Sequence, residues 1–312
     1  MPGTFSKSAT ALRLLLRHPQ GLIIAAGANG LLNYIPDKTY IKMVFRAETG
    51  HRLNLDNPQT YCEKLQWIKL YEQKPIYTTF ADKYAVRDYV KNTVGEEYLV
   101  PLLGVYNTPA EINWADLPQQ FVLKCTNGCG KNIICRDKSQ LNIEQSRQKL
   151  SMWLKQSLFW RGREWGYKNI VPKIICEELI KAEDGKVPKD YKFLCFNGEP
   201  RLIQLHTDRY GNYTMDYYDA EWNKTDIRKK GLPCSDYAEK KPMHFDKMLD
   251  IARQLSKEAT FARVDLYNEQ GKILFGEITM YPNSGFAVFT DDKYDYLLGG
   301  WINLPKQKII QR

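Results

Sequence analysis

The sequence lacks several features that define common protein classes. Residues 21–35 (GLIIAAGANGLLNYI) are mostly apolar, but glycine and asparagine interrupt them, and they fall short of the roughly 20 apolar residues that a membrane-spanning helix needs. The same segment has no signal-peptide cleavage pattern. We therefore expect a cytoplasmic protein without a membrane-spanning helix, whose N-terminal part forms a pair of helices.

Histidine and cysteine are too scarce for a typical zinc protein. The chain has four histidines and seven cysteines in 312 residues. Cys125 and Cys129 are separated by three residues, but no second pair supplies the remaining ligands of a tetrahedral zinc site. The odd number of cysteines, most of them within apolar runs, predicts reduced and buried thiols.

Acidic residues are too few to balance the basic ones. The net charge is +9, which favours anionic partners. Residues 1–36 contain three lysines or arginines and no acid, and the last seven residues contain three more, whereas the rest of the chain has mixed charges. This distribution does not indicate a nucleic-acid-binding stripe. The basic N-terminal segment either packs against the main body or docks peripherally on the anionic inner face of a membrane.

The helix and strand patterns predict an α+β protein with largely antiparallel sheets. In residues 57–72 (NPQTYCEKLQWIKLYE), Thr60 and Glu63 have capping-box spacing and open an amphipathic helix. Further helices are expected in residues 40–50, 78–94, 145–159 and 245–259. Short apolar runs bounded by turn residues predict strands between them, and residues 261–280 predict a hairpin around the turn NEQGK.

A glycine-containing loop joins two strand-like runs in residues 121–132 (FVLKCTNGCGKN). It is not a Walker A loop, because Cys125 stands where the first glycine is needed and Asn132 follows the Gly-Lys pair. A hairpin loop that folds over phosphates, with Lys124 beneath it, fits the pattern. The alternative is a hairpin whose glycines serve only the turn geometry.

Two acidic residues and an arginine are brought together by the second hairpin, residues 261–285 (FARVDLYNEQGKILFGEITMYPNSG). Strand alternation places Arg263 and Asp265 on one face, and Glu277 follows on the next strand. Two carboxylates with few other ligands suit Mg²⁺ ions that bridge triphosphate oxygens. The alternative is an arginine–carboxylate pair on a solvated sheet, which contributes little to stability.

Taken in order, these motifs resemble the ATP-grasp superfamily, and more closely its TupA-like branch, named for a teichuronopeptide biosynthesis protein. The resemblance spans residues 57–289, and its most specific parts are NPQTYCEKLQWIKLY, DYKFLCFNGEP and FGEITMYPNSGF. It implies two α+β lobes that hold ATP between mainly antiparallel sheets. The expected regions are a basic helical N-terminal segment (1–50), a region before the ATP-grasp fold (51–118), a small lobe with the glycine lid (119–183) and a catalytic lobe (184–312).

The resemblance also implies an ATP-binding site. Lys83 and Lys124 would contact the ATP phosphates under the lid, and Asp190 would bind the ribose. The segment KIICEELI alone reads as an ordinary buried strand that reaches solvent, but in this family its last four residues would contact adenine. The full set of residues expected to bind ATP is Lys83, Lys124, Asn127, Gly128, Gly130, Glu177, Glu178, Leu179, Ile180 and Asp190.

The same resemblance assigns catalytic, metal and substrate residues. Arg263 would stabilise the transferring phosphoryl group, and Lys192 would reach phosphates or a substrate carboxylate. Two Mg²⁺ ions would be held by Asp265 and Glu277. The superfamily usually has Glu-x-Asn at the third metal position, where this chain has Thr279, so Asn283 is the candidate replacement. The candidate substrate-binding residues are Arg201, Arg209 and Ser284, although the two arginines could also pair only with surface acids.

The implied function is an ATP-dependent carboxylate–amine ligase that works through an acyl-phosphate. The family association suggests an amino acid or other amine joined to a uronic acid of a surface polysaccharide. Two alternatives are a glycosyltransferase of polysaccharide biosynthesis and an ATP-binding module with a degenerate site. His206, between the two candidate arginines, is interpreted as structural rather than as a base.

Overall fold

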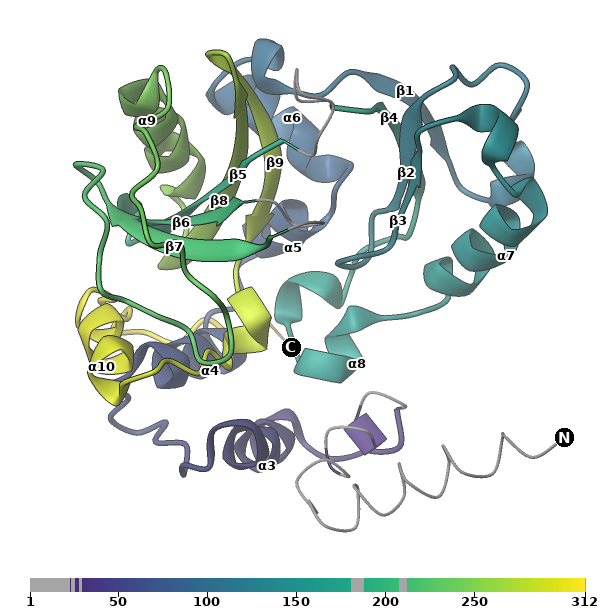
Figure 1. The fold of residues 1–312 in the computed structure, drawn as a ribbon. Coiled ribbons are helices and arrows are strands. Elements are labelled where there is room, and N and C mark those ends of the chain that lie inside the picture. Colours follow the sequence, from purple (N-terminus) through teal and green to yellow (C-terminus); the bar gives the residue numbers. More distant parts are fainter. Residues whose placement is uncertain (1–22, 24–25, 28–29, 181–187, 208–211, 312) are drawn as a thin grey trace, which may run out of the picture.

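Two antiparallel sheets stand side by side in the computed structural model, which describes residues 23, 26–27, 30–180, 188–207 and 212–311 (Figure 1). The smaller sheet has the strand order β1-β4-β2-β3 and the larger has the order β7-β6-β5-β8-β9. This arrangement confirms the α+β prediction. The strands are β1 Leu102–Tyr106, β2 Phe121–Cys125, β3 Asn132–Cys135, β4 Ile174–Glu178, β5 Asp190–Phe196, β6 Glu199–Thr207, β7 Thr214–Asp219, β8 Phe261–Glu269 and β9 Lys272–Thr279.

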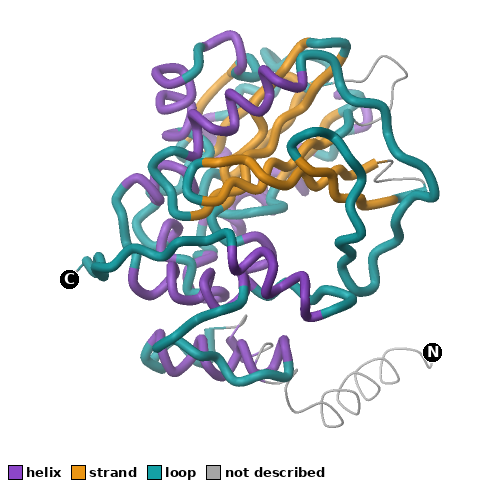
Figure 2. Tube along the Cα trace, turned by 90° about the vertical axis from the view of Figure 1, so that its left-hand side faces the viewer, coloured by secondary structure: helices purple, strands orange, loops and turns teal. Residues whose placement is uncertain are grey.

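Helices cover the outer faces of the sheets and fill the base of the molecule. In both views α3 lies at the lower end, below α4 and α10 (Figures 1 and 2). The α-helices are α3 Asp37–Thr49, α4 Tyr61–Tyr71, α5 Ile76–Ala81, α6 Ala85–Thr93, α7 Ile143–Leu154, α8 Leu158–Gly162, α9 Phe245–Ser256 and α10 Asp292–Gly300. Short 3₁₀ helices are η1 Glu96–Tyr98, η2 Pro109–Glu111, η3 Lys138–Gln140, η4 Trp165–Tyr167 and η5 Pro282–Gly285.

Both predicted hairpins are confirmed. β2 and β3 pair antiparallel, with Lys124 opposite Asn132, so the glycine loop joins them at one end of the small sheet. β8 and β9 pair through a two-residue loop, Gln270 and Gly271, and both residues have a positive φ. Such a loop matches the twist of the two strands.

Each sheet has its own apolar core. The small-sheet core is built around Phe121 and Leu123 of β2 and is closed by Leu150 of α7. The large-sheet core is more extensive, and it joins Phe193 of β5 to α9 and to α4. The two sheets therefore have separate cores, and ligand pockets in proteins occur preferentially between such units.

The helix of residues 57–72 begins as the sequence predicts. Thr60 accepts a hydrogen bond from the backbone N–H of Glu63, and the Glu63 carboxylate accepts one from the N–H of Thr60. The expected amphipathic pattern is wrong, however. Seven of the eleven residues of α4 are buried, and they include Gln66 and Lys69. α4 is therefore surrounded by protein on most sides, because α3, α10 and the loop after β9 all pack on it.

Two predicted single helices are each split into two. Residues 78–94 form the end of α5 and all of α6, because the Asp82 carboxylate accepts hydrogen bonds from the N–H groups of Tyr84 and Ala85 and starts a new helix. Residues 145–159 divide between α7 and α8. The first break matters for the site, since it releases Lys83 from helical geometry.

Other features of the structure bear on what the sequence leads us to expect. β1 lies within residues 51–118, the region expected to precede the ATP-grasp fold, and it pairs with β4 in the small sheet. The domain boundaries themselves stay a prediction. All seven cysteines lie in the described part of the chain and are free, but Cys129 and Cys234 are exposed rather than buried. No helix among the described residues has the length and apolarity to cross a bilayer. Most of the predicted N-terminal helix pair lies outside the described residues.

Candidate active site

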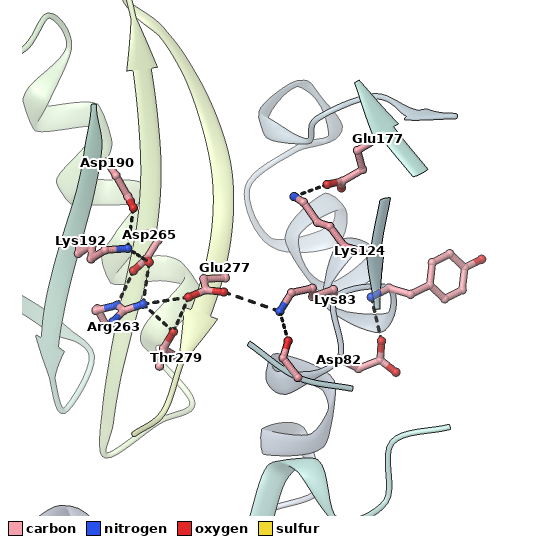
Figure 3. A network of polar contacts seen from close by, with 12 residues as sticks. Asp82, Lys83, Lys124, Glu177, Asp190, Lys192, Arg263, Asp265, Glu277 and Thr279 are labelled. Atoms are coloured by element: carbon pink, nitrogen blue, oxygen red, sulfur yellow. Dashed lines mark hydrogen bonds and ion pairs between the residues drawn. The ribbon is translucent and has the colours of Figure 1, made fainter. Parts of the chain in front are cut away.

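A cavity of about 450 Å³ lies between the two sheets. One wall comes from β2, β4 and the break between α5 and α6, and the other comes from β5, β6, β8 and β9. Figure 3 shows charged side chains from the two walls facing each other, with Glu277 and Lys83 meeting in the middle.

Arg263 organises the carboxylates of the large sheet. Its Nε and Nη2 atoms donate to the two Asp265 oxygens at 2.6 and 2.8 Å, and Nη2 also donates to Glu277 Oε1 at 2.9 Å. The strand register explains this contact, because Asp265 stands directly opposite Glu277 and Arg263 opposite Thr279. The Thr279 hydroxyl accepts from Arg263 at 3.0 Å and donates to Glu277 at 3.1 Å. The prediction that the carboxylates of Asp265 and Glu277 lie close together is therefore confirmed.

Lys192 extends this network across β5. Its ammonium lies 2.7 Å from Asp190 Oδ2 and also pairs with Asp265, which stands opposite it in the neighbouring strand. Burial raises the pKa of Asp265 against the opposing charges of Arg263 and Lys192. Burial also acts on Glu277, but there the positive charges of Lys83, Arg263 and Lys192 prevail and lower its pKa to about 2. Glu277 is therefore ionised at neutral pH.

The facing wall has its own charged group. Lys124 Nζ lies 2.6 Å from Glu177 Oε2, and Arg87 Nη1 lies 2.6 Å from the other oxygen of the same carboxylate. Arg87 also donates to the carbonyl of Val100 at 2.8 Å. Glu177 therefore holds Lys124 and Arg87 at the cavity wall, a role that the sequence pattern did not indicate. The expected contact of Glu177 with adenine remains a prediction.

Lys83 connects the glycine loop with the large sheet. Its ammonium donates to the carbonyl of Gly128 at 2.8 Å and lies 3.8 Å from Glu277 Oε2. Asn127 anchors the same loop from the other side, since its amide donates to the carbonyls of Gln156 and Trp153 at the end of α7. The loop is thus held at two points, and a ligand that displaces Lys83 would release one of them.

Most of the residues expected at the site line this one cavity. Asn127, Gly128 and Ser284 do not line it, and neither does Arg201, which lies at the far end of β6 with its guanidinium 6.0 Å from the Trp301 ring. Arg209 lies outside the described residues. The expected residues that do line the cavity are Lys83, Lys124, Gly130, Glu177, Glu178, Leu179, Ile180, Asp190, Lys192, Arg263, Asp265, Glu277 and Asn283.

Three polar residues of the cavity were missed or undervalued by the sequence reasoning. Arg87 sits on α6 without any motif, and Lys229 follows β7 in an irregular segment, so neither carries a local signal. Burial, together with the nearby charge of Arg263, lowers the pKa of Lys229 to about 8. His206 lines the cavity but its ring nitrogens contact Gln204 at 2.7 Å and Tyr213 at 2.8 Å. These contacts agree with a structural role for His206.

A left-handed turn presents Asn283 to the cavity. Asn283, Ser284 and Gly285 have φ values of 51°, 55° and 71°, a conformation that costs roughly 1–2 kcal/mol at each non-glycine residue. Two side chains of α4 compensate for this strain. Lys69 donates to the carbonyl of Ser284 at 2.6 Å, and Gln66 donates to that of Gly285 at 2.9 Å.

The oxygen ligands available at the site fit magnesium. Asp265 and Glu277 present two opposed carboxylates, and the exposed Asn283 side chain adds an amide oxygen nearby on the cavity wall. Among the described residues no cluster of three or more His, Cys, Asp or Glu side chains forms a complete protein cage. A metal here would need substrate oxygens to complete its shell, which is the usual arrangement for Mg²⁺ with nucleotides.

Comparison with known proteins gives one extended match in sequence. A family model described as TupA-like ATP-grasp matches residues 63–303. No curated protein matches the chain significantly.

Solved structures show remote similarity. D-alanine–D-alanine ligase from Helicobacter pylori is 14% identical with a TM-score of 0.39, and the match covers 72% of this chain and 62% of that one. N5-carboxyaminoimidazole synthase from Aspergillus clavatus is 14% identical with a TM-score of 0.38, and the match covers 74% and 53%. For the ATP-grasp ligase PsnB these values are 10%, 0.38, 70% and 60%. The chain therefore spans less than two thirds of the length of each.

Proposed function

The chain belongs to the TupA-like ATP-grasp family, and from this premise we propose that it is an ATP-dependent ligase that joins a carboxylate to an amine. The observation that carries the proposal is the cavity of about 450 Å³ in which cations of one wall face paired carboxylates of the other. A cleft of this charge pattern suits a magnesium nucleotide, since it offers both phosphate-binding cations and metal-binding oxygens.

Binding of ATP would use both walls. Lys124 and Lys83 line the cavity on the small-sheet side and would contact phosphates, while the end of β4 and Leu179 would offer backbone groups to adenine. Phosphate oxygens would compete with Glu177 for Lys124 and with Glu277 for Lys83. Such an exchange would release Glu277 from Lys83 and make its carboxylate available to a metal ion. Binding of the nucleotide would therefore favour binding of the metal, and the reverse.

The first chemical step is phosphoryl transfer. An oxygen of the substrate carboxylate attacks the γ-phosphorus, the bond to the bridging oxygen of ADP breaks, and an acyl-phosphate forms. Arg263, which Asp265 and Glu277 hold in place, would stabilise the charge on the transferring group. Asp265 and Glu277 would hold magnesium, which supplies further charge neutralisation to the phosphate oxygens when bound.

The second step forms the amide. The amine nitrogen attacks the acyl carbon, inorganic phosphate leaves with the bonding electron pair, and the amine proton is lost to phosphate or solvent. Water would hydrolyse the acyl-phosphate, so the cavity must be closed during this step. The loop of residues 126–131, tied through Gly128 to Lys83, would close over the phosphates.

For the substrate, we propose a uronic acid as the carboxylate and an amino acid as the amine, in the assembly of a surface polysaccharide. The proposal rests on the family relationship and agrees with the net charge of +9, which favours an acidic glycan.

Nucleotide turnover by the purified protein tests this function. ADP and phosphate should appear only when Mg-ATP, a uronic acid and an amino acid are all present, and the product mass should equal that of the amide. Lys124→Met and Glu277→Gln should abolish turnover, whereas Lys42→Met, on the exposed side of α3, should retain it. Consumption of a nucleotide sugar with ATP left intact would show that the protein is a transferase.

A further inference from the structure

Lys229 is a buried cation whose backbone is firmly held. Residues 228–230 pair with residues 288–290 through their backbones, and Lys229 forms an antiparallel bridge with Phe289. The backbone N–H of Lys230 donates to the carbonyl of Val288 at 2.9 Å, and the backbone N–H of Thr290 donates to the carbonyl of Arg228 at 3.0 Å. Alternation along this extended segment turns Lys229 inward and leaves Lys230 exposed. The Lys229 side chain, 9% exposed, lines the cavity between the sheets.

Lys229 differs from its neighbouring cations in having no acidic partner. Lys192 pairs with Asp190 and Asp265, and Arg263 pairs with Asp265 and Glu277. Within the described part of the chain, no carboxylate lies within ion-pairing distance of the Lys229 ammonium. A buried charge without a partner is costly, and the adjacent positive charges of Arg263 and Lys192 increase that cost. An anionic ligand would remove it.

The strand register shows where along the cavity this cation lies. Asp190 and Tyr267 stand opposite each other, Lys192 and Asp265 form the next row on this face, and Arg263 follows two residues further along β8. The Tyr61 ring lies 6.5 Å from the ring of Phe289, the bridge partner of Lys229, and 5.2 Å from that of Phe261, which precedes Arg263 by two residues on β8. Lys229 therefore lies toward the Arg263 end, away from Asp190, the residue expected to bind the ribose.

We propose that Lys229, together with Arg263, binds the carboxylate of the acceptor substrate and presents it for phosphorylation. This subsite rests on the proposed ligase function, in which the acceptor must lie beyond the γ-phosphate, on the side opposite the ribose. Arg263 would then contact both the attacking carboxylate and the phosphoryl group. Lys229 would contact only the carboxylate, which makes it the residue that selects for an acidic acceptor.

Site-specific amine labelling tests the subsite without requiring turnover. The wild-type protein is acetylated at pH 7 with trace acetic anhydride, and the labelling rates of Lys229 and Lys230 are measured by mass spectrometry of the same digest. The assay is run with Mg-AMP-PNP, a non-hydrolysable ATP analogue, and with added D-glucuronate, acetate or uncharged D-glucose. An ion pair that raises the pKa of Lys229 by one unit lowers its reactivity about tenfold.

The proposal predicts that glucuronate, or acetate at higher concentration, slows labelling of Lys229 about tenfold while glucose has no effect. Lys230 should react at the same rate throughout. If Mg-AMP-PNP alone protects Lys229 and the carboxylates add nothing, the ammonium binds nucleotide phosphates and the proposal is wrong. Equal labelling under all conditions also refutes it.

Turnover then separates this inference from the ligase proposal. Lys229→Met should raise KM for the carboxylate at least tenfold, roughly the loss of one charged hydrogen bond, and leave KM for ATP unchanged. Lys229→Arg should restore part of the loss, and Lys230→Met should match the wild type. Normal turnover by Lys229→Met would reject the subsite and leave the ligase standing. Protection of Lys229 by carboxylates, in a protein that turns over none, would reject the ligase instead.

Discussion

Replacement of Lys69 by methionine tests how the active-site turn is held. Lys69 lies on α4, is 2% exposed, and donates to the carbonyls of Ser284 and Gly162 at 2.6 and 3.0 Å. Its positive charge also acts on the buried Glu164, where it opposes the rise in pKa that burial causes. Methionine keeps the apolar stem but removes every one of these contacts. The turn that carries Asn283 into the cavity would then be held by Gln66 and by the hydrogen bond between Ser284 and Glu164.

The expected loss of stability follows from these contacts. Each carbonyl that loses a charged donor costs roughly 1.5–3 kcal/mol, and Gln66 still serves the Ser284 carbonyl at 3.2 Å. Burial already raises the pKa of Glu164, so this acid can take up a proton rather than remain as an isolated charge. We expect Lys69→Met to lower the free energy of unfolding in urea by about 2–4 kcal/mol.

The exposed Lys42→Met is the matched control, and we expect it to change stability by less than about 0.5 kcal/mol. If Lys69→Met were no more destabilising than Lys42→Met, the account of the turn would be wrong.

The pH dependence of the unfolding free energy provides a second test with the same variant. Burial lowers the pKa of Lys69 to about 8, below that of an unfolded lysine, so between pH 8 and 10 the unfolded chain binds more protons than the folded one. The unfolding free energy contributed by Lys69 therefore rises with pH, by roughly 2 kcal/mol. The stability difference between wild type and Lys69→Met should widen over this range, and a narrowing difference would contradict the lowered pKa.

Three further changes test other parts of the structure. Gly285→Ala would place a Cβ atom 2.6 Å from Gln66 Nε2 at a φ of +71°, so it should destabilise more than Gly50→Ala, which has a φ of +79° and open space; equal losses in urea unfolding would refute the contact. Thr60→Ala removes a capping box and should cost about 1 kcal/mol, and no change in the urea midpoint would contradict the cap. Glu277, with its pKa lowered to about 2, stabilises the fold above the unfolded pKa and loses this effect as pH falls toward 2. Its side chain is 37% exposed, so Glu277→Gln should remove only about 1 kcal/mol of acid-dependent stability, and an unchanged pH profile would contradict the ion pairs.

Much of the fold could be predicted because its signals are local. The Thr60 and Glu63 pair marks the start of α4 within four residues, and the Gln270–Gly271 loop marks the β8–β9 hairpin. The hairpin register then places Asp265 opposite Glu277. Alternation and turn chemistry, which act over a few residues, therefore suffice to bring the central carboxylates together.

The remaining parts of the site depend on contacts between distant segments. Lys69 and Ser284 are 215 residues apart, so no local pattern distinguishes this buried lysine from a lysine on the solvated face of an amphipathic helix. Arg87 and Glu177 are 90 residues apart, and Lys229 gains its position from pairing with the segment around Phe289. Such roles follow from tertiary packing, which a single sequence does not encode in short motifs.

Nucleotide binding is the most direct test of the central claim that the cavity between the sheets holds Mg-ATP. Titration calorimetry with AMP-PNP should show one site on the wild-type protein, with affinity that increases when Mg²⁺ is added. Lys124→Met should weaken binding at least tenfold, about the worth of one charged contact, and Glu277→Gln should remove the dependence on Mg²⁺ while nucleotide still binds. If the wild-type protein binds no nucleotide, or binds it equally well after both substitutions, the assignment of the cavity is wrong.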